Sequence, residues 1–425
     1  MTPAKEMTPE IAWAEAMKFE NRPNPYPFFD ELRKTPVAHV GNGVYVITGY
    51  QELLQITHDP RLSSDTRRLK ARAAAKGESA PDSLDAYGEH ASMIQSDPPE
   101  HDKMRRQSMR HFGPPHTPDL IPSMEAPVRK LCNELLDKAK GKTRIDVVND
   151  YAYPVPVMVI CRIMGVPLKD EPQFHAWIHD FMAGLMDLGP ESATPEGKAR
   201  AEKGKASSAA FMQYMTEMIQ GYVKKPDESS MLSKMVNDDG PDGPMTPREV
   251  LTNAMLLFIA GHDSTVNTIS HSVLTLLRNP GSIELLRRRP MLVPRVVEEV
   301  LRLESAVQFF PSRSVTDDIE IGGTVIPKGS PVYLMYGAAN RDPRKFPDPN
   351  KFDPERPNNE HMGWGSGIHV CFGGPLARLE VNLALETFLR RVENPRLVVD
   401  PPPYRRSNVF RGPEHLLIEF DRIRD

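Results

Sequence analysis

The chain has little cysteine: only 3 of its 425 residues are cysteines, and Cys132, Cys161 and Cys371 lie far apart. An odd number of widely separated cysteines argues against a disulfide framework and favours a reducing compartment. A lone cysteine is ordinarily a small buried apolar residue, which is what we expect of Cys132 and Cys161. The protein is therefore expected to be cytoplasmic.

An excess of charge of either sign is also absent. The chain carries 53 Lys and Arg against 57 Asp and Glu, a net charge of -4, so it offers no broad electrostatic footprint for nucleic acid. Residues 1–29 are charged and interrupted by proline, and they lack both the apolar stretch of a signal peptide and the roughly 20 apolar residues of a membrane helix. We expect no membrane anchor.

Proline, by contrast, is abundant: the 42 prolines are spread over many short turns, as in proteins with many sharply ended helices. Residues 24–60 predict a short helix, a hairpin around Gly41-Asn42-Gly43 and a second helix. Residues 100–302 show apolar side chains at three- and four-residue spacing and predict helices. Later segments, 396–420 included, alternate and predict short strands.

The segment 247–280 predicts one helix of roughly 30 residues that is apolar almost all round and therefore buried at the centre of the protein. Its middle holds Gly261, Asp263 and Ser264, where a glycine and a buried carboxylate both destabilise the helix unless they have partners. Such local departures usually mark function. A simple polar kink remains the alternative at this point.

The loop GSGIHVCFGG places Cys371 among four glycines and just before a helix predicted after Pro375. Backbone amides at Gly373 and Gly374, together with the positive end of that helix, can stabilise a thiolate. No second cysteine sits at zinc spacing, so any other ligands of a metal would come from a cofactor. A thiolate-ligated haem fits, and this ligand favours O–O cleavage.

The stretch WGSGIHVCFG, residues 364–373, resembles the haem-binding signature of the cytochromes P450, and four further motifs extend the resemblance from about Asn24 to Glu419. The resemblance implies a single domain over residues 1–425, with 1–23 as an N-terminal extension. It implies a mainly α fold with small β-sheets, a triangular prism around a long central helix. It also implies haem b as cofactor and a monooxygenase that hydroxylates or oxidatively dealkylates a hydrophobic organic substrate.

The same resemblance assigns residues to roles. Cys371 is the expected axial metal ligand. The expected haem-binding residues are His101, Arg105, Ala260, Gly261, Arg313, His369, Cys371 and Gly373. The expected proton-delivery residues are Asp263, Ser264 and, as second choice, Thr265. The expected structural network comprises Glu299, Arg302 and Arg356.

Spacing and chemistry agree with several of these roles. His101 and Arg105 lie four apart on one helix face, where two donors can grip a carboxylate such as a haem propionate. The Ser264 hydroxyl can bond back to the carbonyl of Ala260 and open a groove for water. Serine replaces the usual threonine at 264, and Trp364 replaces a usual phenylalanine beneath the thiolate, where it could tune the haem potential.

By position in the family, a set of mostly apolar residues lines the substrate pocket. They are Ile94, Leu256, Ile259, Gln308, Phe309, Val409 and Phe410, with a lid made of Phe181, Met182, Leu185 and Met186. These side chains favour a hydrophobic substrate, although any pocket of this family is apolar and such residues often only pack.

No flavin or iron–sulfur motif is visible, so electrons are expected from a separate ferredoxin and its reductase, and the protein is expected to be a monomer. Arg106, Arg110 and Arg378 are the candidates for docking an acidic partner. Two alternatives remain: a peroxide-driven haem-thiolate peroxygenase, and a non-catalytic haem protein that senses gas or carries a ligand.

Overall fold

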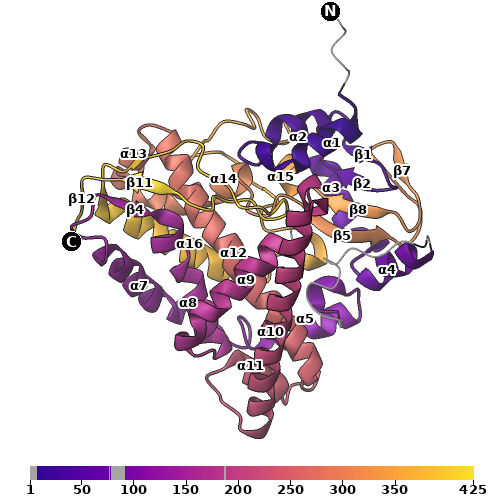
Figure 1. Ribbon diagram of the computed structural model, residues 1–425, viewed down its shortest axis with the longest axis horizontal. Helices are drawn as coiled ribbons and strands as arrows, with labels where there is room; N and C mark the ends of the chain where they lie inside the picture. The colour runs from indigo at the N-terminus through magenta and orange to yellow at the C-terminus, as the bar shows by residue number, and fades with distance from the viewer. Residues whose placement is uncertain (1–6, 76, 78–90, 186–187) are drawn as a thin grey trace, which may run out of the picture.

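The computed structural model describes residues 7–75, 77, 91–185 and 188–425 of the chain. It is mainly helical with small sheets and has a flattened, triangular outline (Figure 1). The helices are α1 Pro9–Met17, α2 Tyr26–Arg33, α3 Tyr50–Thr57, α4 Thr66–Ala75, α5 Glu100–Arg110, α6 Leu120–Ser123, α7 Glu125–Asp137, α8 Pro154–Met164, α9 Glu171–Leu185, α10 Pro195–Lys224, α11 Met231–Val236, α12 Pro247–Arg278, α13 Ser282–Arg288, α14 Val293–Leu303, α15 Tyr336–Ala339 and α16 Gly374–Arg391.

The strands among these residues are short and form four small sheets. They are β1 Val37–His39, β2 Tyr45–Ile47, β3 Leu62–Ser63, β4 Arg144–Asp146, β5 Phe310–Val315, β6 Ile319–Ile321, β7 Thr324–Ile326, β8 Pro331–Leu334, β9 Val392–Glu393, β10 Arg396–Leu397, β11 Leu417–Glu419 and β12 Arg422–Ile423. The largest sheet has the order β1-β2-β8-β5-β3, with β2 and β8 parallel. It occupies one corner of the molecule, beside the helical remainder (Figure 1).

The predicted hairpin of residues 24–60 is confirmed. Strands β1 and β2 pair antiparallel between α2 and α3. The turn residues Gly41, Asn42 and Gly43 all have positive φ, a backbone region that glycine and asparagine adopt most readily. The turn sequence thus determines this corner of the sheet.

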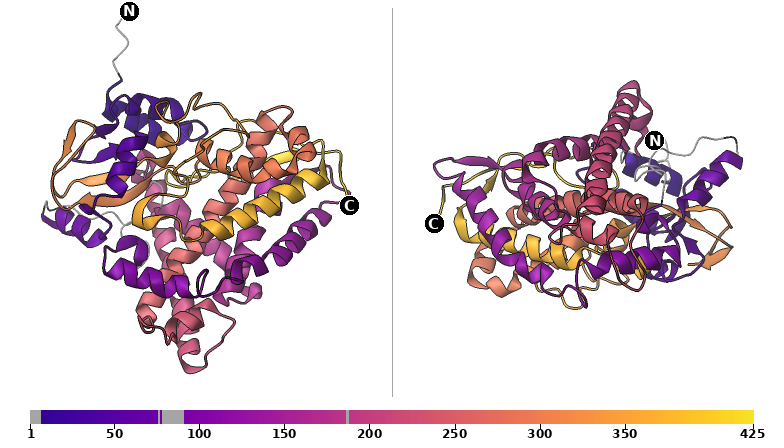
Figure 2. Two further views of the ribbon diagram at one scale, coloured as in Figure 1. Left: turned by 180° about the vertical axis from the view of Figure 1, so that it is seen from behind. Right: turned by 90° about the horizontal axis from the view of Figure 1, so that it is seen from below.

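The long central helix is also confirmed as α12. It begins with a capping box in which the Thr246 hydroxyl accepts from the Glu249 amide, and Pro247 fills the first helical position. Helix α12 packs against α8, α10, α14 and α16, and most of its length is buried. Viewed from behind, α16 and α7 lie side by side across the back face (Figure 2, left).

Two expectations for the ends of the chain need correction. Residues 9–17, assigned to an extension, form α1, which starts at the N-cap Thr8 and buries Ala12 and Ala16 against α2. Its one buried stripe is too short for a periodic signal. Most of segment 396–420 is irregular, with β10 and β11 at its ends and isolated bridges between. Its many prolines cannot donate to a ladder.

Within the described residues, no helix combines the length and the apolar character needed to cross a membrane.

Candidate active site

The cysteine loop brings backbone amides to the sulfur of Cys371. The loop closes where the Cys371 amide donates to the carbonyl of Trp364 at 2.7 Å. Gly367 has φ of +70°, and a Cβ there would lie 2.1 Å from the carbonyl oxygen of Thr57, so only glycine fits. Helix α16 starts at Gly374, which directs its first amides toward the thiol.

The Cys371 side chain is accessible to solvent, yet dense protein surrounds its sulfur. The resulting desolvation raises the pKa of the thiol, while hydrogen bonds from the amides of Gly373 and Gly374 and the charges of Arg105 and Arg378 lower it. The amides and charges are arranged to favour an anion at a site where burial opposes one. A metal bound at the sulfur would complete this stabilisation.

Four cationic or donor side chains meet beside this loop. His101 and Arg105 come from α5, Arg313 from β5 and His369 from the loop itself. The rings of His101 and His369 lie 4.5 Å apart between centroids, and Arg105 donates through Nη2 to the carbonyl of Val370 at 2.8 Å. Burial, followed by the charges of Arg313, His101 and Arg105, lowers the pKa of His369 to about 2. The structure thus brings these four predicted residues together.

This cluster fits an anionic ligand with two carboxylates. Nε2 of His101 is buried without a hydrogen-bond partner in the structure, whereas its Nδ1 pairs with Asp102 at 2.7 Å. Two guanidinium groups and one open imidazole nitrogen match the propionates of a haem whose iron is bound at Cys371. The Ser64 hydroxyl, which sequence reasoning missed, fixes the His369 ring at Nε2 over 2.6 Å.

The middle of α12 departs from the burial of the rest of the helix. Ala260 is exposed and Gly261 and Ser264 are half-buried, although the residues on either side are buried. The predicted back-bond is present: the Ser264 hydroxyl donates to the Ala260 carbonyl at 2.7 Å. We call the solvent-accessible surface of these three small residues the recess on α12; it leaves space beside the helix, as an apposed haem and dioxygen require.

The other two polar residues of this segment face elsewhere. Thr265 is 3 % exposed and lies on a different face from Ser264. Asp263 is buried and accepts hydrogen bonds from Nδ2 of Asn267 at 3.1 Å and from Nη1 of Arg405. Arg405 was not predicted, because it stands 142 residues away and no local pattern marks it.

The predicted Glu–Arg–Arg network is assembled in the core. Glu299 and Arg302 are fully buried, and Glu299 receives two hydrogen bonds of 2.8 Å from Arg302. Arg356 donates to both oxygens of the same carboxylate, at 3.1 and 3.2 Å. The two guanidinium groups also donate to the carbonyls of Asn340, Pro347, Asp348, Pro349 and Lys351. One carboxylate thereby holds the irregular segment before the cysteine loop.

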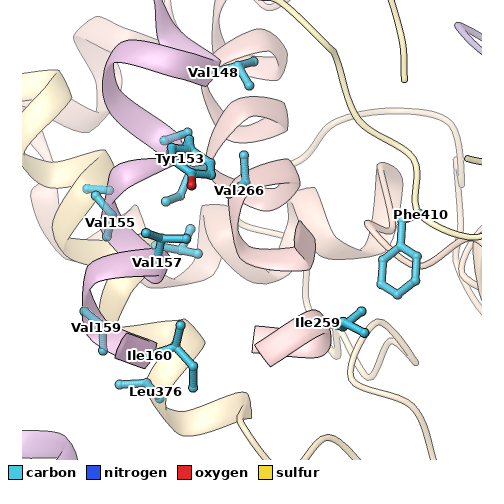
Figure 3. Packing of buried hydrophobic residues seen from close by; sticks show 14 of the residues in the cluster. Val148, Tyr153, Val155, Val157, Val159, Ile160, Ile259, Val266, Leu376 and Phe410 are labelled. Atoms are coloured by element: carbon cyan, nitrogen blue, oxygen red, sulfur yellow. The ribbon is translucent and has the colours of Figure 1, made fainter. Parts of the chain in front are cut away.

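Five of the predicted pocket residues come from three separate parts of the chain. Leu256 and Ile259 lie on α12 ahead of the recess, Ile94 is half-buried, and Val409 and Phe410 lie in the C-terminal loop. In Figure 3, Ile259 and Phe410 lie on the same side of the apolar cluster, away from the α8 side chains Val155 and Val159.

Gln308 and Phe309 make well-defined contacts within the protein. Phe309 is fully buried, stacked on Tyr333 at 5.7 Å between centroids and edge-on to Trp13 at 5.6 Å. Gln308 donates through Nε2 to the carbonyl of Ser305 at 2.6 Å. Their assignment to the substrate pocket stays a prediction, because Ile259 and Val409 of the same predicted set are buried to a similar extent.

The predicted lid lies partly on α9. Phe181 and Met182 are buried, and Phe181 lines a small cavity with Trp177, Phe211 and Ile259. Nothing is described of the Leu185 side chain, and Met186 lies outside the described residues.

The candidate docking arginines all have acidic partners within the chain. Arg106 pairs with Asp242 at 2.7 Å, Arg110 with Asp238 at 3.0 Å and Arg378 with Glu298 at 2.8 Å. These carboxylates offset the charge that would attract an acidic partner.

Comparison with known proteins agrees with this geometry. The sequence profile of the family described as Cytochrome P450 matches residues 12–289 and 282–420. The chain is 34 % identical to the biotin biosynthesis cytochrome P450 of Bacillus subtilis, over 94 % of this chain and 96 % of that protein. It is 32 % identical to 6-deoxyerythronolide B hydroxylase of Saccharopolyspora erythraea, over 93 % and 96 %. The crystal structure of Mycobacterium smegmatis CYP164A2 superposes with a TM-score of 0.84 at 30 % identity, covering 96 % of this chain and all of the other.

Proposed function

The chain belongs to the cytochrome P450 family and is a haem-thiolate monooxygenase, and from this premise we propose roles for its residues, a class of substrate and a source of electrons. The observation that carries the proposal is the recess on α12, where Ala260, Gly261 and Ser264 interrupt an otherwise buried helix. Haem b, when bound, supplies activation of dioxygen, so that one oxygen atom enters the substrate and the other leaves as water.

The residues of the cysteine loop and of α5 hold this cofactor. Cys371 provides the thiolate, which the amides of Gly373 and Gly374 stabilise. His101, Arg105, Arg313 and His369 would hold the two propionates through charge-assisted hydrogen bonds. The charges of these side chains would offset those of the two propionates.

Asp263 and Ser264 deliver protons. The reaction consumes substrate, dioxygen, two electrons and two protons, and yields the oxygenated product and water. The Asp263 carboxyl group, which faces away from the recess, and the Ser264 hydroxyl group at the recess act in series to supply the two protons by general acid catalysis. Because Arg405 and Asn267 hold the Asp263 carboxylate, protons reach the recess through the Ser264 hydroxyl and water beside it.

Replacing Asp263 with asparagine is expected to reduce dioxygen-dependent product formation by about 10² or more, the lower range for loss of a general acid. Ser264→Ala is expected to uncouple the reaction, so that electrons are consumed while hydrogen peroxide replaces product. The matched control is Ser270→Ala, because the Ser270 hydroxyl makes the same bond to the Val266 carbonyl at 2.8 Å but is fully buried. Product yield per electron pair, measured with isotopically heavy dioxygen, is the readout.

The two alternatives predict different results from the same assay. With hydrogen peroxide in place of dioxygen and electrons, the oxidant brings both protons, so Asp263→Asn is expected to retain turnover. A peroxygenase would instead turn over faster with peroxide than with a ferredoxin system. A non-catalytic haem protein would incorporate no heavy oxygen. Equal loss in the Ser270→Ala control would contradict the role of Ser264.

We propose a hydrophobic organic substrate. Leu256, Ile259, Val409 and Phe410 present only hydrocarbon, which favours an apolar ligand. Two similar proteins are named as a 6-deoxyerythronolide B hydroxylase and a vitamin D(3) 25-hydroxylase, and both names denote large apolar molecules. A library screened for ligand-induced high-spin shifts of the haem absorbance tests this proposal.

We propose that a ferredoxin and its reductase donate the electrons and that the protein acts as a cytoplasmic monomer. The family match fills residues 12–420 without room there for a flavin or iron–sulfur domain. All three cysteines are free, and burial raises the pKa of Cys132 and Cys161 to about 12, which suits inert thiols in a reducing compartment.

A further inference from the structure

A second, half-buried carboxylate network is centred on the residue next to Glu299 and contacts the cysteine loop directly. Its centre is Glu298 on α14, whose side chain is 28 % exposed. The Trp364 indole donates to its Oε2 at 2.9 Å, and Arg378 of α16 donates through Nε to Oε1 at 2.8 Å and through Nη2 to Oε2 at 3.2 Å. Neither the sequence motifs nor the proposed function uses this residue.

His361 completes the network with a defined tautomer. Its Nδ1 accepts from the amide of Gly363 at 2.9 Å, so the ring proton of the neutral form lies on Nε2 and donates to Glu298 at 3.0 Å. Although burial raises the pKa of Glu298, the hydrogen bonds from His361, Arg378 and Trp364 outweigh it and lower this pKa to about 2. Glu298 is therefore ionised at neutral pH.

The network is connected to Cys371 through the backbone of Trp364 and through the packing of Trp364 and Arg378 around Gly374. The carbonyl of Trp364 accepts from the Cys371 amide at 2.7 Å, so the residue that bonds Glu298 also closes the cysteine loop. The Arg378 guanidinium lies 4.4 Å from the centroid of the Trp364 ring. A Cβ built on Gly374 would lie 3.6 Å from both the Trp364 ring and Arg378, and 3.9 Å from the Cβ of Cys371.

The charges of this network bear on the bound cofactor. Arg378 is among the cations that favour a negative charge on the Cys371 sulfur. Glu298 offsets that cation, and solvent screens both charges only in part, because the Arg378 side chain is 43 % exposed and the Glu298 side chain 28 % exposed. Reduction adds one electron to the bound haem iron, so an uncompensated cation nearby favours the reduced state.

We infer that Glu298 is a positioning residue that balances the charge of Arg378 beside the cysteine loop and thereby sets the reduction potential of the haem bound at Cys371. Trp364, where the family usually has phenylalanine, couples the two because its indole N–H holds the carboxylate against the loop. The inference rests on the proposed ligation of haem by Cys371. It adds Glu298 as the residue that adjusts the reduction potential of that haem.

The test is an equilibrium titration of the haem potential with dithionite and redox dyes, without any protein partner. Glu298→Gln keeps the side-chain shape and removes the negative charge, so it is expected to raise the potential. Arg378→Gln removes the cation and is expected to lower it. Each substitution is expected to change the equilibrium constant for reduction of the haem threefold to tenfold. For a one-electron couple, at about 59 mV per tenfold change, this corresponds to a potential shift of about 30 to 60 mV. The double variant is expected to return near the wild-type value.

Glu386→Gln is the matched control, since Glu386 is a carboxylate on the same helix as Arg378, two turns further along, and pairs with Arg129 at 3.4 Å. Its expected shift is below twofold. If the Glu298→Gln protein does not retain haem, the inference is tested by Arg378→Gln alone: a lowered haem potential supports it, and a raised or unchanged potential contradicts it. Equal potentials in wild type and both haem-loaded variants, or shifts of the same sign, would overturn the inference. A wild-type protein that binds no haem overturns the proposed function as well, which distinguishes the two failures.

Discussion

Replacing Glu299 with alanine is expected to yield a protein that no longer incorporates haem. The substitution leaves two buried guanidinium groups, those of Arg302 and Arg356, without their shared carboxylate. Removing one partner of a buried ion pair costs about 3–5 kcal/mol, because the remaining charge stays uncompensated. That cost is a large fraction of the roughly 5–15 kcal/mol by which domains are stable.

The effect is expected to reach the site through the segment that these arginines hold. Arg302 and Arg356 bond five carbonyls between residues 340 and 351, and this segment leads into the cysteine loop. Haem content per protein and the urea midpoint measure the loss. Glu355→Ala is the control. Glu355 also precedes the cysteine loop, but its ion pair with Arg289 is exposed and contributes at most about 1 kcal/mol to stability. A soluble, haem-loaded and merely slower Glu299→Ala protein contradicts the structural role.

Replacing Cys371 with serine is expected to abolish monooxygenation, by about a thousandfold or more, equivalent to about 4 kcal/mol of transition-state stabilisation. The thiolate is the ligand that favours O–O cleavage, and a serine hydroxyl stays protonated at neutral pH. The folded protein is expected to survive, because Gly373 and Gly374 can donate to an oxygen as they do to sulfur.

Cys161→Ala provides the comparison for this variant. Cys161 is buried on α8, and burial raises its pKa to about 12, so its sulfur is inert and makes no ligand. Its substitution is expected to leave product formation and the haem spectrum unchanged. Monooxygenation by the Cys371→Ser protein at more than a tenth of the wild-type rate would be incompatible with thiolate ligation.

Features encoded in short stretches of sequence were predicted well. The 41–43 turn, the apolar periodicity of α12 and the glycines around Cys371 each depend on residues close together in the chain, and each is present as expected. The back-bond from Ser264 to Ala260 belongs to this group, because a hydroxyl four residues along a helix lies above the carbonyl it bonds.

Distant residues were predicted to meet only where the family resemblance assigned them a shared role, as for Glu299 and Arg356, and other long-range partners were missed. Arg405 bonds Asp263 across 142 residues, and Arg378 bonds Glu298 across 80. No periodicity connects such partners. The ring contacts of Phe309 were missed for a related reason: its aromatic neighbours Trp13 and Tyr333 come from two other parts of the fold. Tertiary context decided these positions.

The most direct test of the account is the absorption spectrum of the ferrous carbonyl complex of the purified wild-type protein. Thiolate ligation through Cys371 predicts one dominant Soret band at the red-shifted position that distinguishes haem-thiolate proteins from histidine-ligated ones. A band at the position typical of histidine ligation, or folded protein that carries no iron porphyrin, would contradict it.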